Sequence, residues 1–118
     1  GFRGGIGMYS TATDLFKWQQ ALFADKILSK KSREKLFTPY NQTSKGMHTY
    51  GWYISETKSG AKYYWTAGYE DFGHNGIIKV YADGTLIIVL TNSGDIDEKP
   101  ARDLVSEGLE QMIFDDKR

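Results

Sequence analysis

The chain has 118 residues, of which 40% are hydrophobic and 25% are charged, and its 15 basic residues balance 15 acidic ones. This length fits one modest domain, the composition is that of a globular protein rather than a disordered one, and the balanced charge predicts no nucleic-acid partner. No apolar run approaches the roughly 18 residues of a transmembrane segment, and the absence of cysteine excludes disulfides, thiol catalysis and Cys-ligated zinc.

Two helices are predicted in the first third of the chain. Thr11 and Asp14 have the spacing of a capping interaction, so a first helix is expected to begin there. The residues expected to face the core are Leu15, Phe16, Trp18, Leu22 and Phe23. The residues expected to face water are Lys17, Gln19 and Gln20. Ser29 is expected to cap a short second helix over residues 30–37, which ends before Pro39.

Strands are predicted in the second half of the chain. Residues 41–49 are polar and contain a glycine, which predicts a loop. Four antiparallel strands are then expected over residues 50–56, 61–67, 74–81 and 85–92. Asp83-Gly84 is a strong signal for a hairpin turn between the last two of these strands. The run from Leu86 to Leu90 is apolar at consecutive positions, which predicts burial on both faces and helices on each side of the sheet.

The last part of the chain is predicted to be a polar loop over residues 92–99, followed by a helix. Pro100 suits the first turn of this helix. Its expected core-facing stripe consists of Leu104, Val105, Leu109, Met112 and Ile113. The order of elements predicts an α+β fold, with an antiparallel β-sheet of about four strands flanked by helices.

Two short motifs imitate those of serine hydrolases. Ser32-Arg33-Glu34-Lys35 is a literal Ser-x-x-Lys match, in which a lysine one helical turn after a serine can accept its proton. A nucleophile of this kind sits at the buried start of a core helix, whereas this match is charge-rich, so it is interpreted as a solvent-facing turn. Lys58-Ser59-Gly60 imitates a Lys-Thr-Gly box but falls between two predicted strands, and is interpreted as a hairpin turn.

Other residues are candidates for binding a metal ion or a carbohydrate. Glu70, Asp71 and His74 lie in one loop and His48 lies elsewhere, but a metal site needs three or four convergent ligands, so none is predicted. The aromatic residues that alternate along two strands are Tyr50, Trp52, Tyr63 and Trp65. Cross-strand packing explains them most simply. A non-catalytic module that binds a cell-wall glycan or peptide through this sheet face or the 70–74 loop stays an alternative.

Three longer motifs occur in a family-specific order. "GGIGMYSTATDLFKWQQAL", residues 4–22, has a glycine pair and then Ser-Thr-x-x-Asp-Leu. "YGWYI", residues 50–54, is similar to a Tyr-Gly-x-Gly-Trp strand start that lacks one glycine. Residues 65–92 combine an x-[Thr/Ser/Ala]-Gly box, a Gly-containing loop and an apolar strand that ends in Asn. In this order they resemble the C-terminal part of the serine β-lactamase-like family: class C β-lactamases, D-alanyl-D-alanine carboxypeptidases and related esterases.

The resemblance implies a set of site residues. Thr66-Ala67-Gly68 takes the place of the family's third motif, and His74-Asn75-Gly76 is the alternative. The first is preferred, because it ends a predicted strand before a loop. The residues then implied in substrate binding are Thr66, Ala67, Gly68 and His74. A catalytic role falls to Tyr69, whose backbone N–H would be an oxyanion-hole donor. Thr66 stands where the family has a cation that helps to bind a substrate carboxylate.

The resemblance also implies a function. The chain is expected to be a segment of a bacterial serine hydrolase that cleaves a β-lactam, a D-Ala peptide or a carboxylic ester through an acyl-enzyme, without a cofactor. The substrate is a small molecule or a peptide, and the expected location is periplasmic or extracellular. A pseudoenzyme on the same fold is a further alternative.

The family's Ser-x-x-Lys and Tyr-x-Asn motifs precede the parts that match here. Residues 1–118 are therefore expected to be the C-terminal portion of one β-lactamase-like domain, truncated at the N-terminus and inactive alone. Gly1, in place of an initiator methionine, fits this expectation. Apolar surfaces uncovered by such a truncation would allow a homodimer.

Overall fold

A computed structural model describes residues 8–69 and 73–115. The helices are α1 (Ala12–Phe23), α2 (Lys30–Leu36), α3 (Ala101–Glu110) and the π-helical turn η1 (Gln111–Asp115). The strands are β1 (Asn41–Thr43), β2 (Gly46–His48), β3 (Tyr53–Glu56), β4 (Lys62–Tyr69), β5 (Asn75–Tyr81), β6 (Leu86–Thr91), β7 (Asp95–Ile96) and β8 (Lys99–Pro100). Across these two ranges, no helix has the length and apolar character needed to cross a bilayer.

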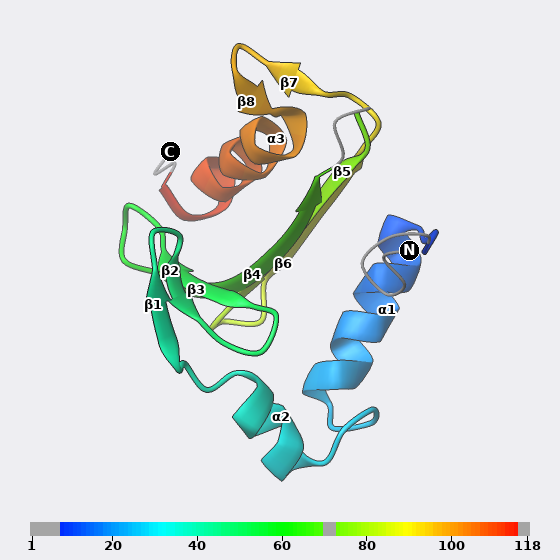
Figure 1. The fold of residues 1–118 in the computed structure, drawn as a ribbon, viewed down its shortest axis with the longest axis vertical. Coiled ribbons are helices and arrows are strands. Elements are labelled where there is room, and N and C mark those ends of the chain that lie inside the picture. The colour runs from blue at the N-terminus through cyan, green and yellow to red at the C-terminus, as the bar shows by residue number, and fades with distance from the viewer. Residues whose placement is uncertain (1–7, 70–72, 116–118) are drawn as a thin grey trace.

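A curved antiparallel sheet forms the centre of the molecule, with α1 and α2 on one face and α3 on the other (Figure 1). In the described part of the chain, β1 to β6 make one six-stranded sheet in which each strand pairs with the next in sequence. β7 and β8 form a separate ribbon directly before α3. The predicted α+β fold is therefore confirmed, with a sheet that is two short strands wider than expected.

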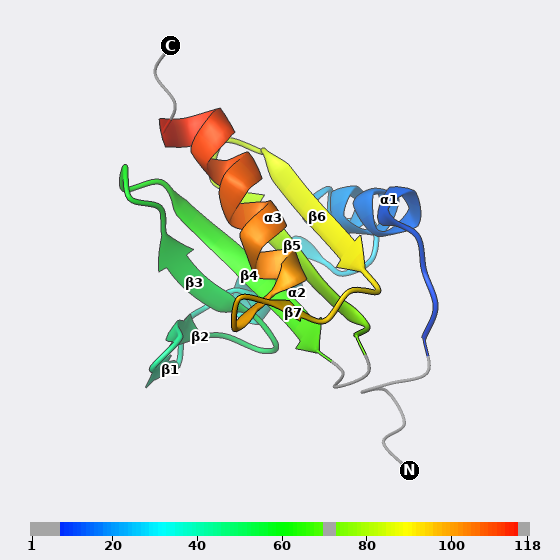
Figure 2. The ribbon, with the colours of Figure 1, turned by 90° about the horizontal axis from the view of Figure 1, so that it is seen from above.

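Apolar side chains on the two faces of the sheet form separate clusters. Toward α1 and α2 the buried members are Leu22, Phe37, Trp52, Ile78 and Val80. Toward α3, which crosses the opposite face in Figure 2, the buried members are Ile77, Tyr81, Ile87 and Val89. Successive residues of a strand point to opposite faces, so β5 and β6 contribute alternately to both clusters. This confirms the prediction that helices cover both sides of the apolar strand at Leu86 to Leu90, although Leu90 itself is exposed.

The predicted helix starts are confirmed. The Thr11 hydroxyl accepts a hydrogen bond from the Asp14 backbone N–H at 3.1 Å and caps α1. The Ser29 hydroxyl accepts one from the Ser32 N–H at 3.2 Å and caps α2. These bonds satisfy N–H groups that have no partner within the first helical turn, and they fix where each helix begins.

The buried face of α1 differs from the prediction. Gln19 and Leu22 are each only 2% exposed, whereas Phe16 and Trp18 are 43% and 44% exposed. The expected apolar stripe was too broad to lie on one face of a helix that meets the sheet on one side only. The prediction that Gln19 faces water is therefore wrong, and a polar side chain occupies a core position.

Two segments predicted as loops contain short strands. Residues 41–49 form the β1–β2 hairpin, in which Gly46 has a φ of 111° and a Cβ would lie 2.4 Å from the Ile54 carbonyl oxygen. Residues 92–99 contain β7 and β8, joined through Asp97 and Glu98 at positive φ. Both hairpins are polar and largely exposed, so they lack the alternating apolar pattern by which strands are recognised.

The predicted core-facing stripe of α3 is also wrong. Val105 and Leu109 are exposed, as are Met112 and Ile113 in the turn that follows. The face toward the sheet combines apolar and polar residues: Ala101 and Ser106 are buried, Leu104 is half-buried, and Glu110 contacts β5. In an amphipathic helix the apolar stripe is expected to face the core, whereas here most of that stripe faces solvent.

Glu110 explains the polar face of α3. Its carboxylate lies 3.3 Å from the Lys79 ammonium and accepts a hydrogen bond from the Tyr81 hydroxyl. Burial and this carboxylate raise the pKa of Tyr81. Burial is also the main reason why the pKa of neighbouring Tyr63 is raised to about 12. An ion pair between α3 and β5 takes the place of the predicted apolar contacts.

We predict that Gln19→Leu stabilises the chain. Both polar atoms of the Gln19 amide are buried without a hydrogen-bond partner among the described residues. A buried polar group left unsatisfied costs about 1–3 kcal/mol, so replacing it with leucine should raise the free energy of unfolding by about 1–2 kcal/mol. Urea unfolding followed by circular dichroism measures this change. Gln20→Leu, at an exposed position of the same helix, is the control, and a loss of stability in Gln19→Leu alone would contradict the burial of Gln19.

Candidate functional site

The end of β4 borders a groove that we call the strand-end groove. It is a cavity of about 540 Å³ between the end of β4, the start of β5, the end of β6 and the residues around the start of α1. Its lining residues are Met8, Tyr9, Ser10, Leu15, Thr66, Ala67, Gly68, Tyr69, His74, Asn75, Gly76, Ile77, Ile78, Leu90 and Thr91. The structure thus brings together all five residues implied by the family resemblance. Thr66 and Ala67 are half-buried, whereas Gly68, Tyr69 and His74 are exposed, so the side chains of residues 8–69 and 73–115 leave the strand end open.

The register of β4 determines where the Tyr69 backbone N–H points. The Thr57 N–H donates to the Ala61 carbonyl at 2.9 Å, so odd-numbered residues from position 61 onward direct their backbone groups toward β3. The Ala82 N–H donates to the Lys62 carbonyl at 3.3 Å, so even-numbered residues direct theirs toward β5. The pairing with β5 continues in register to Tyr69, whereas the pairing with β3 ends before it. The Tyr69 N–H therefore points away from β5, on the side where β4 extends beyond β3.

Arg102, at the start of α3, holds the end of β4. Its Nη1 donates to the Gly68 carbonyl oxygen, and its guanidinium carbon lies 5.8 Å from the centre of the Tyr69 ring. The Nε group lies 3.3 Å from the Asp103 carboxylate, and the Arg102 side chain is only 13% exposed. The sequence does not mark Arg102 as a site residue, because 34 residues separate it from Gly68 and it belongs to no motif.

Asn75 ties the start of β5 to two other segments. Its side chain is buried, and its Nδ2 donates to the Ser93 carbonyl at 2.8 Å. Its Oδ1 accepts from the backbone N–H of Arg102 at 3.3 Å. Asn75 is the middle residue of the alternative motif His74-Asn75-Gly76, which coincides with the start of β5 rather than with the end of a strand. The assignment of the third motif to Thr66-Ala67-Gly68 stays a prediction.

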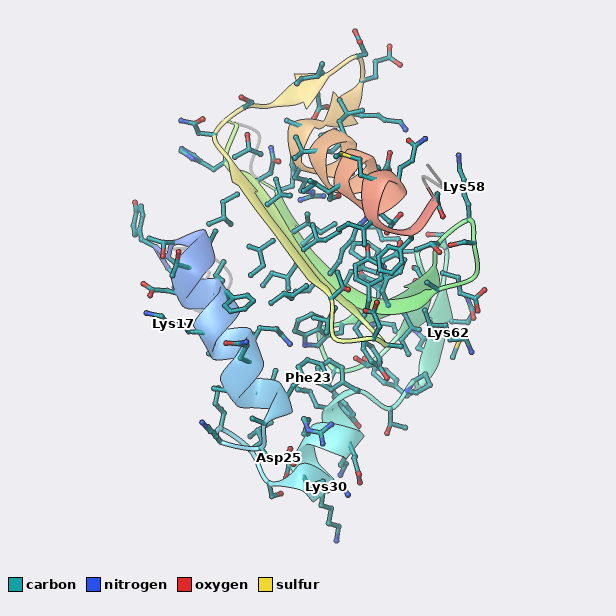
Figure 3. All side chains as sticks on the ribbon, turned by 180° about the vertical axis from the view of Figure 1, so that it is seen from behind. Lys17, Phe23, Asp25, Lys30, Lys58 and Lys62 are labelled. Atoms are coloured by element: carbon teal, nitrogen blue, oxygen red, sulfur yellow. The ribbon has the colours of Figure 1, made fainter. Side chains whose placement is uncertain are left out.

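The two imitations of hydrolase motifs lie outside the groove. Ser32 is exposed on α2, and its hydroxyl accepts a hydrogen bond from the Ser29 hydroxyl at 3.0 Å. Every residue of α2 is exposed or half-buried, as expected for a solvent-facing segment. Lys58 lies at the tip of the β3–β4 hairpin (Figure 3), which agrees with its interpretation as part of a turn.

The aromatic rings on the α3 side of the sheet form a stacked row. His48 and Tyr53 have ring centres 4.6 Å apart, as do Tyr53 and Trp65, and each pair is inclined by 26°. The Trp65 indole N–H donates to the Ser55 hydroxyl at 3.0 Å. Stacked rings cover one another's faces, and a sugar platform needs such faces. The row thus favours packing over glycan binding.

The residues considered as metal ligands are Glu70, Asp71, His74 and His48. Glu70 and Asp71 lie outside the described residues. Among residues 8–69 and 73–115, no three His, Asp or Glu side chains gather in a way that could hold a metal ion. His48 lies on β2 within the aromatic row, and His74 lies at the groove.

Two known proteins that are similar to this chain are both described as penicillin-binding proteins. No protein-family model matches it. A Bacillus subtilis (strain 168) protein, provisionally named penicillin-binding protein PbpX, is 40% identical over 52 residues, which are 44% of this chain and 12% of that protein. The crystal structure of a penicillin-binding protein from Bacillus halodurans superposes with a TM-score of 0.70 and 23% identity, over 86% of this chain and 30% of that one. The predicted resemblance to the serine β-lactamase-like family is confirmed. This chain spans less than a third of either relative.

We predict that Asn75→Ala destabilises the chain. The substitution leaves the Ser93 carbonyl and the Arg102 N–H without the side chain that pairs with them, which should lower the free energy of unfolding by about 1–3 kcal/mol. Denaturant unfolding measures the loss, and amide hydrogen exchange at Arg102 should become faster. His74→Ala, at the exposed neighbouring position, should change stability by less than about 0.5 kcal/mol. Equal stabilities of the two variants would contradict the bridging role of Asn75.

Proposed function

We propose that residues 1–118 are the C-terminal portion of a penicillin-binding protein-like domain that hydrolyses amide or ester bonds through a serine. The acyl group binds at the end of β4, beside the strand-end groove, and the Tyr69 backbone N–H is one donor to its carbonyl oxygen. The nucleophilic serine and its lysine base belong to other parts of the domain, so the chain alone is expected to be inactive. The observation that supports this most strongly is the direction of the Tyr69 N–H, which points away from β5 at an exposed strand end.

The chemistry follows from this donor. The serine oxygen attacks the substrate carbonyl and passes its proton to the lysine, and the carbonyl oxygen becomes negatively charged. The Tyr69 N–H and the N–H of the nucleophile stabilise that charge. The C–N or C–O bond then breaks, the leaving amine or alcohol takes the proton, and an acyl-enzyme remains. Water attacks the acyl-enzyme, releases the acid and restores the serine.

The edge of β4 is the proposed support for the rest of the substrate. Ala67 and Tyr69 direct their backbone groups to the same side of the strand, where an extended acyl chain can pair with them as an added strand. Thr66 offers a hydroxyl to this substrate rather than a positive charge. We therefore propose an ester or peptide that does not depend on a carboxylate at this position, in preference to a β-lactam.

The experiment uses the full-length product of the gene that encodes this chain. Tyr69→Pro removes the backbone N–H and should slow acylation by chromogenic esters about 10²–10³-fold, which is the cost of losing one oxyanion donor. Stopped-flow measurement of the acylation burst gives the rate, and circular dichroism confirms that the variant is folded.

Two variants serve as controls. Tyr69→Ala keeps the N–H while removing the ring, so its acylation rate should stay close to that of the wild type. Ser32→Ala should have no effect. If Tyr69→Pro and Tyr69→Ala lose activity equally, or if Ser32→Ala abolishes it, the proposal is wrong.

A further inference from the structure

The peptide bond between Gly68 and Tyr69 is engaged at its carbonyl end by a cation. Arg102 Nη1 donates to the Gly68 carbonyl oxygen. In a trans peptide unit the C=O and the N–H point in opposite directions. The Gly68 carbonyl points toward β5 and the Tyr69 N–H points away from it, so the carbonyl bound by Arg102 and the N–H at the exposed strand end lie at opposite ends of one dipole.

A cation on the carbonyl strengthens the N–H at the other end of the peptide. Hydrogen bonds in a chain polarise one another by an estimated 10–30% per bond, and bonds to an ionised group are roughly twice as strong as neutral ones. An arginine guanidinium is a charged donor, and only 13% of the Arg102 side chain is exposed to screening by water. Its position over the Tyr69 ring, 5.8 Å from the ring centre, adds a second contact on the same strand end.

The guanidinium is itself held in place. Asp103 accepts from its Nε side at 3.3 Å, and the Arg102 backbone N–H donates to Asn75 Oδ1 at 3.3 Å. The start of α3, the start of β5 and the end of β4 therefore form one connected network. An arrangement fixed before the substrate arrives is what electrostatic stabilisation of a transition state requires.

We propose that Arg102 is a positioning residue, which orients and polarises the Gly68–Tyr69 peptide so that the Tyr69 N–H is a stronger donor to a developing oxyanion. The effect of Arg102 on catalysis rests on the proposed function, in which the Tyr69 N–H is an oxyanion donor. The coupling between Arg102 and the peptide is a property of this chain, and it can be measured without any turnover.

The first measurement is NMR spectroscopy of the 118-residue chain. Arg102→Met should shift the carbonyl carbon resonance of Gly68 and the amide resonances of Tyr69, because the charged donor is lost. Lys99→Met is the matched control, since Lys99 forms an exposed ion pair with Glu107 near the start of the same helix at 3.7 Å. Unchanged resonances at both Gly68 and Tyr69 in Arg102→Met would overturn the proposal.

The second measurement is the kinetics of the full-length protein. Arg102→Met should lower kcat roughly 3–30-fold with little change in KM, which is less than the loss expected for removing an oxyanion donor outright. Added guanidinium should restore part of kcat in Arg102→Ala, an effect that a purely structural tie between α3 and the sheet does not predict. An equal effect on KM, or no rescue, would overturn the positioning role. If the wild type shows no turnover, the proposed function fails, and the NMR result still decides whether Arg102 acts on the peptide.

Discussion

The pairing of β4 with β5 beyond the end of β3 is the constraint on which the site depends. The register runs unbroken to Tyr69 and its partner Asn75, so the alternation of backbone directions is carried to the last residue of the strand. A shift of one residue would turn the Tyr69 N–H toward β5 and present the Gly68 N–H instead. Main-chain pairing alone thus selects which peptide N–H points away from β5 at the strand end, and the side chain at position 69 has little part in it.

Polar contacts add to the apolar packing that connects α3 and the turn after it to this sheet. Arg102 and Asn75 join the helix start to the strand ends, while the Lys79–Glu110 ion pair joins the helix end to the middle of β5. Buried polar groups cost stability unless they are paired, and in return their directional bonds fix a geometry that apolar packing leaves looser. The helix is therefore held at a defined angle to the strand whose end borders the groove.

The sequence predicts those features that are local. The Thr11 cap and the Asp83-Gly84 turn depend on a few adjacent residues, and both occur as predicted. The burial of Gln19 and the polar inner face of α3 could not be predicted, because the sheet that contacts each helix decides which face is inside. The contact of Arg102 with Gly68 has no local signature at all, since only the folded topology brings α3 to the end of β4.

A crystal structure of the full-length protein with a boronic acid bound to its serine tests the central claim most directly. The tetrahedral adduct places an oxygen where the oxyanion forms. We predict that this oxygen lies about 2.7–3.1 Å from the Tyr69 backbone nitrogen, with Arg102 still on the Gly68 carbonyl. An adduct whose oxygen points away from β4, or lies within reach of other backbone N–H groups but not of the Tyr69 N–H, would contradict the account.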